Sequence, residues 1–133
     1  MIKTPPSEAA VALFAALNAR DPKSFTARLA DDAVFHFPGT KTISGAARIE
    51  QFLKILFFKY PRLTFEIGRV IADASGAAVE WTNEGETREG APYRNAGVTV
   101  LHLEGGLIVY LSDTFKDTSA FVKDGATPTA GGS

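Results

Sequence analysis

The chain has 133 residues, of which 45% are hydrophobic, and this is enough for one domain with a substantial core. Its 14 basic and 15 acidic residues give a net charge of -1 and form no basic run, so we expect neither nucleic acid nor an anionic membrane as partner. The absence of cysteine excludes disulfides and thiolate chemistry, and two histidines are too few for a dense metal site, so we expect no metal.

No segment has the pattern of a signal peptide, and no apolar run approaches the ~20 residues of a membrane span. We therefore expect a soluble, cytoplasmic protein. Residues 1–6 and 122–133 have little that can pack, and they are predicted to be flexible ends of a single domain over residues 7–121.

The first part of the chain has helical periodicity. Ser7 is predicted to cap a helix with a core-facing stripe formed by Ala10, Leu13, Phe14 and Leu17. Asp21 followed by Pro22 predicts the start of a short second helix, which is expected to end at Asp31 and Asp32.

A short strand is predicted over residues 34–37, bounded by Pro38 and Gly39. Ser44 is then predicted to open a third helix, and Pro61 forbids its continuation past Tyr60. We expect it to be the principal helix of the core, because it carries a wide apolar stripe that is formed by Ile49, Phe52, Leu53, Leu56, Phe57 and Tyr60.

Beyond the third helix the apolar period changes to two, which predicts strands over residues 63–71, 77–84, 93–103 and 107–115. The connections are hairpin-sized and rich in glycine, so neighbouring strands should pair antiparallel. Helices followed by strands predict an α+β fold. We expect a cone in which a curved antiparallel sheet wraps around the N-terminal helices and encloses an apolar pocket.

The last predicted strand contains one carboxylate on an apolar face. Every second residue is apolar in the series Leu107, Val109, Leu111, Asp113 and Phe115, with the exception of Asp113. By the same count Asp117 shares this face. If neighbouring apolar side chains desolvate Asp113, its carboxyl is biased towards the neutral form, which suits an acid or base.

The motifs ARDP, DDAVFHFPG, SGAARIEQFL and GGLIVYLSDTFKD resemble the nuclear-transport-factor-2-like superfamily in its SnoaL-like branch. The resemblance extends over residues 7–121. It implies a cone-shaped α+β fold with a deep apolar pocket, commonly dimeric, which hosts ketosteroid isomerases, polyketide cyclases, limonene epoxide hydrolases and binders without activity. Because these share a fold and not a site, the function must be argued from residues.

Two of these enzymes are matched poorly. The catalytic aspartate and tyrosine of ketosteroid isomerases would fall at Phe37 and Leu13, and their protonated aspartate would fall near Thr99, which can donate a hydrogen bond. In limonene epoxide hydrolases the water-holding tyrosine and asparagine would fall at Phe35 and Phe37. Neither residue set is retained.

The same comparison with limonene epoxide hydrolases places Trp81 and Asn83 where an arginine and an aspartate are expected. Their remaining aspartate would fall at Lys116 by strict alignment, or at Asp117 with a one-residue bulge. The DTSAF spacing favours Asp117.

SnoaL-like cyclases require mainly one carboxylate in an apolar pocket, so the resemblance leaves Asp113 and Asp117 as candidate acids or bases. Each has a structural alternative: Asp113 as a buried carboxylate held by hydrogen bonds, and Asp117 as the cap of the turn that follows. The candidate ligand-binding residues are Leu13, Phe35, Phe37, Trp81, Asn83, Asn95 and Thr99.

Two hypotheses remain open. The first is an isomerase, cyclase or hydrolase that needs no cofactor and acts on a small apolar carbonyl compound. The second is a non-catalytic ligand-binding or dimeric assembly module, because the expected site is apolar where related enzymes place working groups. The outer face of the sheet, with Val98, Val100, His102 and Tyr110, predicts a homodimer.

Overall fold

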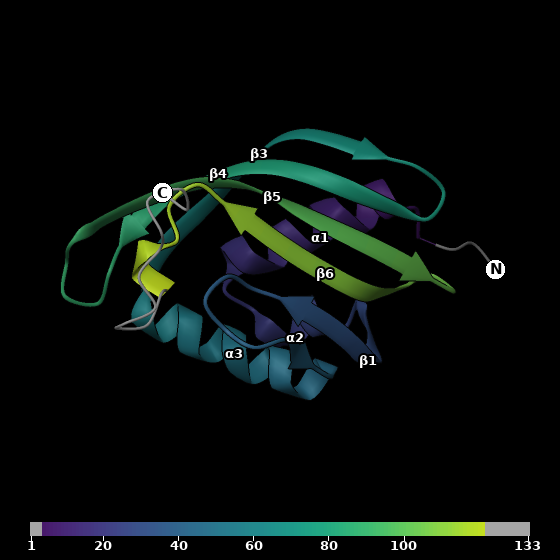
Figure 1. Cartoon of the computed structure of the whole chain (residues 1–133), viewed down its shortest axis with the longest axis horizontal. Coiled ribbons are helices and arrows are strands. Elements are labelled where there is room, and N and C mark those ends of the chain that lie inside the picture. The colour runs from purple at the N-terminus through teal and green to yellow at the C-terminus, as the bar shows by residue number, and fades with distance from the viewer. Residues whose placement is uncertain (1–3, 122–133) are drawn as a thin grey trace.

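A curved sheet of six strands, with the helices gathered on one of its faces, forms the architecture in the computed structural model, which describes residues 4–121 (Figure 1). The helices are α1 (Pro6–Ala19), α2 (Pro22–Thr26), α3 (Ala46–Lys59) and a final 3-10 helix, η1 (Ser119–Phe121). The strands are β1 (Leu29–His36), β2 (Ile43–Ser44), β3 (Arg62–Ala72), β4 (Gly76–Glu86), β5 (Pro92–Glu104) and β6 (Leu107–Phe115). The predicted α+β fold with a curved sheet is confirmed.

The predicted helix starts have different outcomes. Asp21 does cap α2, because its carboxylate accepts a hydrogen bond from the Ser24 backbone N–H at 3.2 Å. Ser7 does not cap α1, since the helix begins one residue earlier at Pro6, a residue type suited to the first helical turn. Ser44 was expected to open α3, but it lies in β2, and Gly45 precedes the helix with a φ of 97°.

The short helix and the strand after it also differ from the prediction. α2 ends at Thr26, and β1 already begins at Leu29, so Asp31 and Asp32 lie inside this strand. The predicted flexible ends fall almost entirely outside the described residues; of residues 1–6, only 4–6 are described, and α1 starts among them.

The sheet has the order β2-β1-β6-β5-β4-β3. The predicted antiparallel meander from β3 to β6 is confirmed, because each consecutive pair in this series is antiparallel. β1 joins the other edge of β6 in parallel, which makes the sheet mixed. The hairpin-sized connections predict only the antiparallel pairs, since the β1 pairing joins strands that are distant in sequence.

Part of the predicted alternation in β6 is wrong, because this strand contains a β-bulge. Leu103 pairs with Ile108 and His102 pairs with Tyr110, so Val109 is an extra residue in the ladder. The bulge turns Ile108 into the core with 0% exposure and leaves Leu107 43% exposed. Alternation resumes beyond the bulge, so Asp113 faces the interior of the cone as expected.

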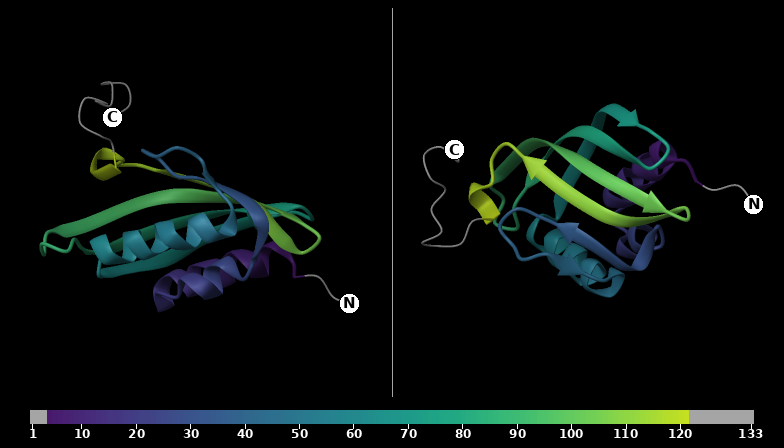
Figure 2. Two further views of the ribbon diagram at one scale, coloured as in Figure 1. Left: turned by 90° about the horizontal axis from the view of Figure 1, so that it is seen from below. Right: turned by 45° about the vertical axis from the view of Figure 1, so that its right-hand side comes forward.

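The helices cover the concave face of the sheet, with α1 against β3 and α3 beneath β1 (Figures 1 and 2). Arg20, the residue after α1, holds the far end of α3 in place. Its guanidinium donates hydrogen bonds to the carbonyl oxygens of Phe57 at 2.6 Å and Tyr60 at 2.9 Å, which satisfies carbonyls that the helix end leaves free. These bonds tie the end of α3 to the end of α1.

Candidate functional site

An apolar cavity lies between the helices and the concave face of the sheet. Side chains from α1, α2, α3, β1, the four strands of the meander and η1 line it, and eight of them are phenylalanines. Its volume is about 50 Å³. A water molecule needs roughly 10–15 Å³ by this measure, so the space is a real cavity and not a packing defect. Its polar side chains are Tyr60, Asn83, Tyr93, Thr99 and Asp113.

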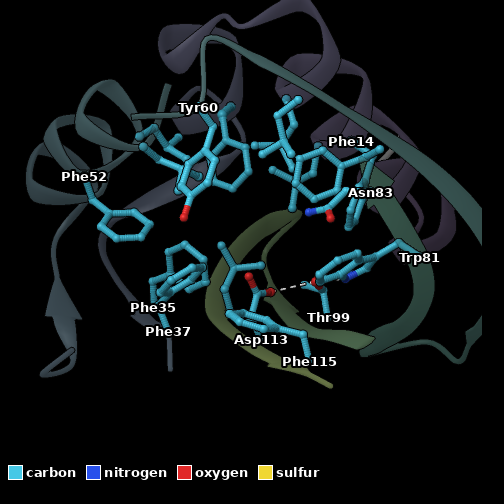
Figure 3. A pocket seen from close by; sticks show the side chains of 18 of the residues that line it. Phe14, Phe35, Phe37, Phe52, Tyr60, Trp81, Asn83, Thr99, Asp113 and Phe115 are labelled. Atoms are coloured by element: carbon cyan, nitrogen blue, oxygen red, sulfur yellow. Dashed lines mark hydrogen bonds between the residues drawn. The ribbon is translucent and has the colours of Figure 1, made fainter. Parts of the chain in front are cut away.

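Three side chains in the cavity wall form a chain of hydrogen bonds (Figure 3). The indole Nε1–H of Trp81 donates to Thr99 Oγ1 at 2.9 Å, and the Thr99 hydroxyl donates to Asp113 Oδ1 at 2.6 Å. Because the indole can only donate, Thr99 must direct its own hydrogen to the carboxyl group. β4, β5 and β6 each contribute one of these residues, and ladder pairing places Thr99 directly opposite Asp113. The sheet register therefore fixes the orientation of the Asp113 carboxyl group.

Asp113 is half-buried and lines the cavity. Burial raises the pKa of Asp113 from 3.8 to about 7, and the hydrogen bond from Thr99 opposes part of this rise because it favours the charged form. Oδ2 receives no hydrogen bond from any residue in the described part of the chain. One oxygen is thus held by the protein, while the other is left for a molecule in the cavity, at a pKa suited to proton transfer near neutral pH.

Tyr60 lies on the opposite side of the cavity, and its hydroxyl points inwards (Figure 3). The residue is 5% exposed, and its ring packs at an interplanar angle of 48° against Tyr93, with a centroid distance of 4.7 Å. Burial raises the pKa of Tyr60, so the phenol stays protonated and can donate a hydrogen bond. The helical pattern assigned Tyr60 only to the apolar stripe of α3; its place as the last residue before Pro61 gives no signal that the hydroxyl reaches the cavity.

The structure brings together most of the residues predicted for the site. Seven of them line the cavity, namely Leu13, Phe35, Phe37, Trp81, Asn83, Thr99 and Asp113. Trp81 is also part of the core, since it is 5% exposed and packs on Phe14, Phe65 and Phe115.

Asn95 and Asp117 lie elsewhere, at the end of β6. Asn95 exchanges two hydrogen bonds with the Asp117 backbone and donates a third to the Tyr93 hydroxyl at 2.9 Å. The exposed Asp117 carboxylate accepts a bond from the Ser119 N–H at 3.0 Å and so caps the turn into η1. Hydrogen bonds from Ser119 lower the pKa of Asp117, which keeps it ionised. The geometry at Asp117 is that of its structural alternative.

Phe121, on η1, closes one side of the cavity. Its ring packs on Phe37, Tyr60 and Phe115 at centroid distances of 5.1, 6.0 and 5.5 Å. Its backbone oxygen occupies the space where a Cβ on Gly39 would stand. Gly39, at a φ of 85°, therefore allows η1 to approach the turn after β1 and to place Phe121 over the cavity.

Two further features of residues 4–121 bear on function. The described part of the chain contains no group of three or more histidine or acidic side chains arranged to hold a metal ion. None of the helices in this part is both long and apolar enough to cross a membrane.

The fold and cavity define a class of protein: a cone of helices and curved sheet with an apolar interior and a single carboxyl group in its wall. Residues 10–111 match the family model of the SnoaL-like domain. The chain belongs to this family, as its motifs predict. No curated protein matches the sequence.

Solved structures with this fold are numerous. An NTF2-like protein of unknown function from Burkholderia pseudomallei K96243 has 19% identity and a TM-score of 0.80, with 88% of this chain and 94% of that one covered. A protein from Jannaschia sp. CCS1, proposed to be a SnoaL-like polyketide cyclase, has 18% identity and a TM-score of 0.79, with 90% of each chain covered. TerC, co-crystallised with polyporic acid, has 22% identity and a TM-score of 0.76, with 89% of this chain and 95% of that one covered. Identities this low show a common fold.

Proposed function

We propose that this protein is an enzyme that needs no cofactor and moves a proton at the carbon next to the carbonyl group of a small apolar molecule, with Asp113 as acid and base. The observation that carries the proposal is a single carboxyl group in an apolar cavity with one oxygen fixed by Thr99 and the other free. The pKa of Asp113, raised by burial to about 7, supports both roles near neutral pH. The similarity to a proposed polyketide cyclase is consistent with this chemistry.

The reaction would begin with the ionised Asp113. Oδ2 removes a proton from the α-carbon, and the electron pair of the broken C–H bond moves onto the carbonyl oxygen to form an enolate. Tyr60 would donate a hydrogen bond to that oxygen from the opposite wall, where the developing charge needs a donor. For isomerisation of an unsaturated carbonyl compound, Asp113, now protonated, returns the proton to another carbon of the conjugated enolate. For cyclisation, the enolate carbon attacks a second carbonyl group, and Asp113 gives its proton to the alkoxide that forms.

A non-catalytic binder is the second candidate. It is favoured by the apolar side chains of Leu13, Phe35 and Phe37 in the wall, at positions where the resembling enzymes carry working groups. The Trp81 to Thr99 to Asp113 chain would then serve to satisfy buried polar groups.

Deuterium exchange separates the two candidates. Small ketones such as cyclohexanone, 1-indanone and 2-tetralone would be incubated with the protein in D2O, and loss of the α-hydrogen signals followed by NMR. We expect the wild-type protein to accelerate exchange of at least one ketone, and Asp113→Asn to reduce the acceleration by about 100-fold or more.

Asp117→Asn is the matched control, because it makes the same charge change at an exposed carboxylate outside the cavity. It should keep the activity. Accelerated α-hydrogen exchange that persists in Asp113→Asn, or that is lost in Asp117→Asn, would contradict the assignment of Asp113 as acid and base. Binding of ketones without accelerated exchange would favour the non-catalytic candidate.

A further inference from the structure

The side chain of Asn83 is buried in the cavity wall without a partner. It is 8% exposed, and its Oδ1 is buried and accepts no hydrogen bond within residues 4–121. Figure 3 shows the amide group directed into the cavity, between Phe14 and Trp81. A buried acceptor without a donor destabilises a fold, so such a group calls for an explanation.

The polar neighbours of Asn83 are already engaged. The indole N–H of Trp81, two residues earlier on β4, donates to Thr99. Asn95 is the ladder partner of Asn83 on β5, but its amide donates to the Tyr93 hydroxyl and to the Asp117 carbonyl oxygen. Phe65, the ladder partner on β3, offers only a ring. No donor on the adjacent strands is bonded to Asn83 Oδ1 in the described part of the chain, and the amide faces whatever fills the cavity.

We propose that Asn83 determines specificity by binding a hydroxyl group on the ligand, and that the ligand is a hydroxylated ring compound. A hydroxyl group both donates and accepts, so it satisfies the amide whichever way its oxygen and nitrogen are placed. A carbonyl group accepts only, and would leave Oδ1 unpaired. The aromatic rings that line the cavity favour a flat ring as the body of the ligand.

This inference rests on the proposed function for one point, the position of the ligand. With its carbonyl group near Asp113 and Tyr60, the hydroxyl group lies at the end that meets Asn83. A molecule that lacks the hydroxyl leaves the amide unpaired and is rejected, which is a stronger basis for selection than apolar fit alone.

Phenol and toluene test the inference, since they have the same shape and differ by a hydroxyl in place of a methyl group. Binding would be followed by NMR at the indole N–H of Trp81, which is the single tryptophan of the chain and lies in the cavity wall. We expect the wild-type protein to bind phenol about tenfold more tightly than toluene, the ratio that one good hydrogen bond provides. Asn83→Leu, which keeps the number and branching of the side-chain heavy atoms but removes the amide, should abolish this preference.

Two more variants complete the test. Asn83→Ser keeps a hydroxyl group in the wall and should retain part of the preference. Thr82→Val removes a polar group from the same strand on its exposed outer face and should change nothing. A thermal melt of each variant shows whether it folds; Asn83→Leu should melt no lower than the wild type, because it removes an unpaired buried amide.

The inference is overturned if the wild-type protein binds phenol and toluene equally, if it binds neither, or if the preference persists in Asn83→Leu. Measurements on Asp113→Asn distinguish a failure of this inference from a failure of the proposed function. A preference for phenol that needs Asn83 and survives Asp113→Asn supports the inference even if no ketone exchanges its hydrogens. A preference that instead needs Asp113 overturns the inference and leaves the acid and base role intact.

Discussion

Replacement of Asp113 by asparagine should make the protein more stable above about pH 4, and the full gain should be reached above about pH 7. The side chains of aspartate and asparagine have nearly the same shape. Asparagine is uncharged, like the protonated form of Asp113. The substitution therefore tests how strongly the cavity disfavours the ionised form. The other titratable groups in the cavity wall are Tyr60 and Tyr93, whose pKa values burial raises from 10.0, so both remain neutral over the range of interest.

The sign follows from proton binding in the two states. In the unfolded chain Asp113 ionises near its ordinary pKa of 3.8, and in the folded protein burial raises that pKa to about 7. Between these values the folded state holds a proton that the unfolded state has lost, so the stability falls as the pH rises, and the loss is complete above about pH 7. At about 1.36 kcal/mol for each pKa unit, the full interval amounts to about 4 kcal/mol. Because Asp113 is only half-buried, solvent screens part of the charge, and we expect about 2 to 4 kcal/mol.

Urea denaturation of the wild type and Asp113→Asn at a series of pH values measures this difference. The two proteins should be about equally stable near pH 4, and the variant should be more stable by about 2 to 4 kcal/mol near pH 8. Asp117→Asn should behave in the opposite sense, with a loss of stability at neutral pH, because hydrogen bonds from Ser119 lower the pKa of Asp117 in the folded state. A stability difference for Asp113→Asn that is the same at pH 4 and pH 8 would refute the reasoning.

Three further predictions concern neighbouring parts of the structure. Thr99→Val removes the donor at 2.6 Å from Asp113 and should raise the pKa of Asp113 above its wild-type value. A pH titration of the Trp81 indole N–H by NMR would detect the change, and an unchanged titration midpoint would contradict this prediction. Arg20→Met removes both guanidinium bonds to the end of α3 and should lower the free energy of unfolding by roughly 2 to 4 kcal/mol in urea titrations; a loss below about 0.5 kcal/mol would show that these bonds are not needed. We propose that two copies associate through the outer face of the sheet, where Val100 is 44% exposed. Light scattering should then show a dimer for the wild type and a monomer for Val100→Glu. A wild-type monomer at micromolar concentration would refute the proposal.

The period of apolar residues in the sequence predicts the fold well, because burial of one face of each element enforces that period. The four strands of the meander begin and end within two residues of their predicted bounds, since one face of each strand must meet the core. Helix starts are predicted less well. At Asp21 the capping residue alone sets the start of α2. At the other two helices a neighbouring residue sets the boundary through its backbone preference, namely Pro6 beside Ser7 and Gly45 beside Ser44.

The bulge at Val109 shows what periodicity cannot predict. Counting by two gives the right face for Asp113 because Leu111 and Phe115, the buried residues on either side of it, lie on the same side of the bulge as Asp113. At Leu107 itself the same count gives the wrong face. A bulge leaves the composition of a strand unchanged and shows only in its pairing with the neighbouring strand.

Tyr60 and Asn83 show the corresponding limit for the site. Both were predicted to face the interior, but the role of a polar group there depends on whether a neighbour satisfies it. The Trp81 indole could have bonded to Asn83 and instead bonds to Thr99, a choice that rests on side-chain geometry between two strands. The sequence thus predicts the members of the cavity wall, whereas their hydrogen bonds require the structure.

The hydrogen-bond chain also explains why one carboxyl group suffices as a candidate acid and base. Trp81 occupies an acceptor position on Thr99, and this directs the Thr99 hydrogen to Asp113 Oδ1 and leaves Oδ2 towards the cavity. A structural role alone would require only that the carboxyl be satisfied, and an asparagine could accept the same bond without the burden of a charge at neutral pH. Asp113 is an acid where a neutral group would be more stable, which is consistent with the role in proton transfer that we propose for it.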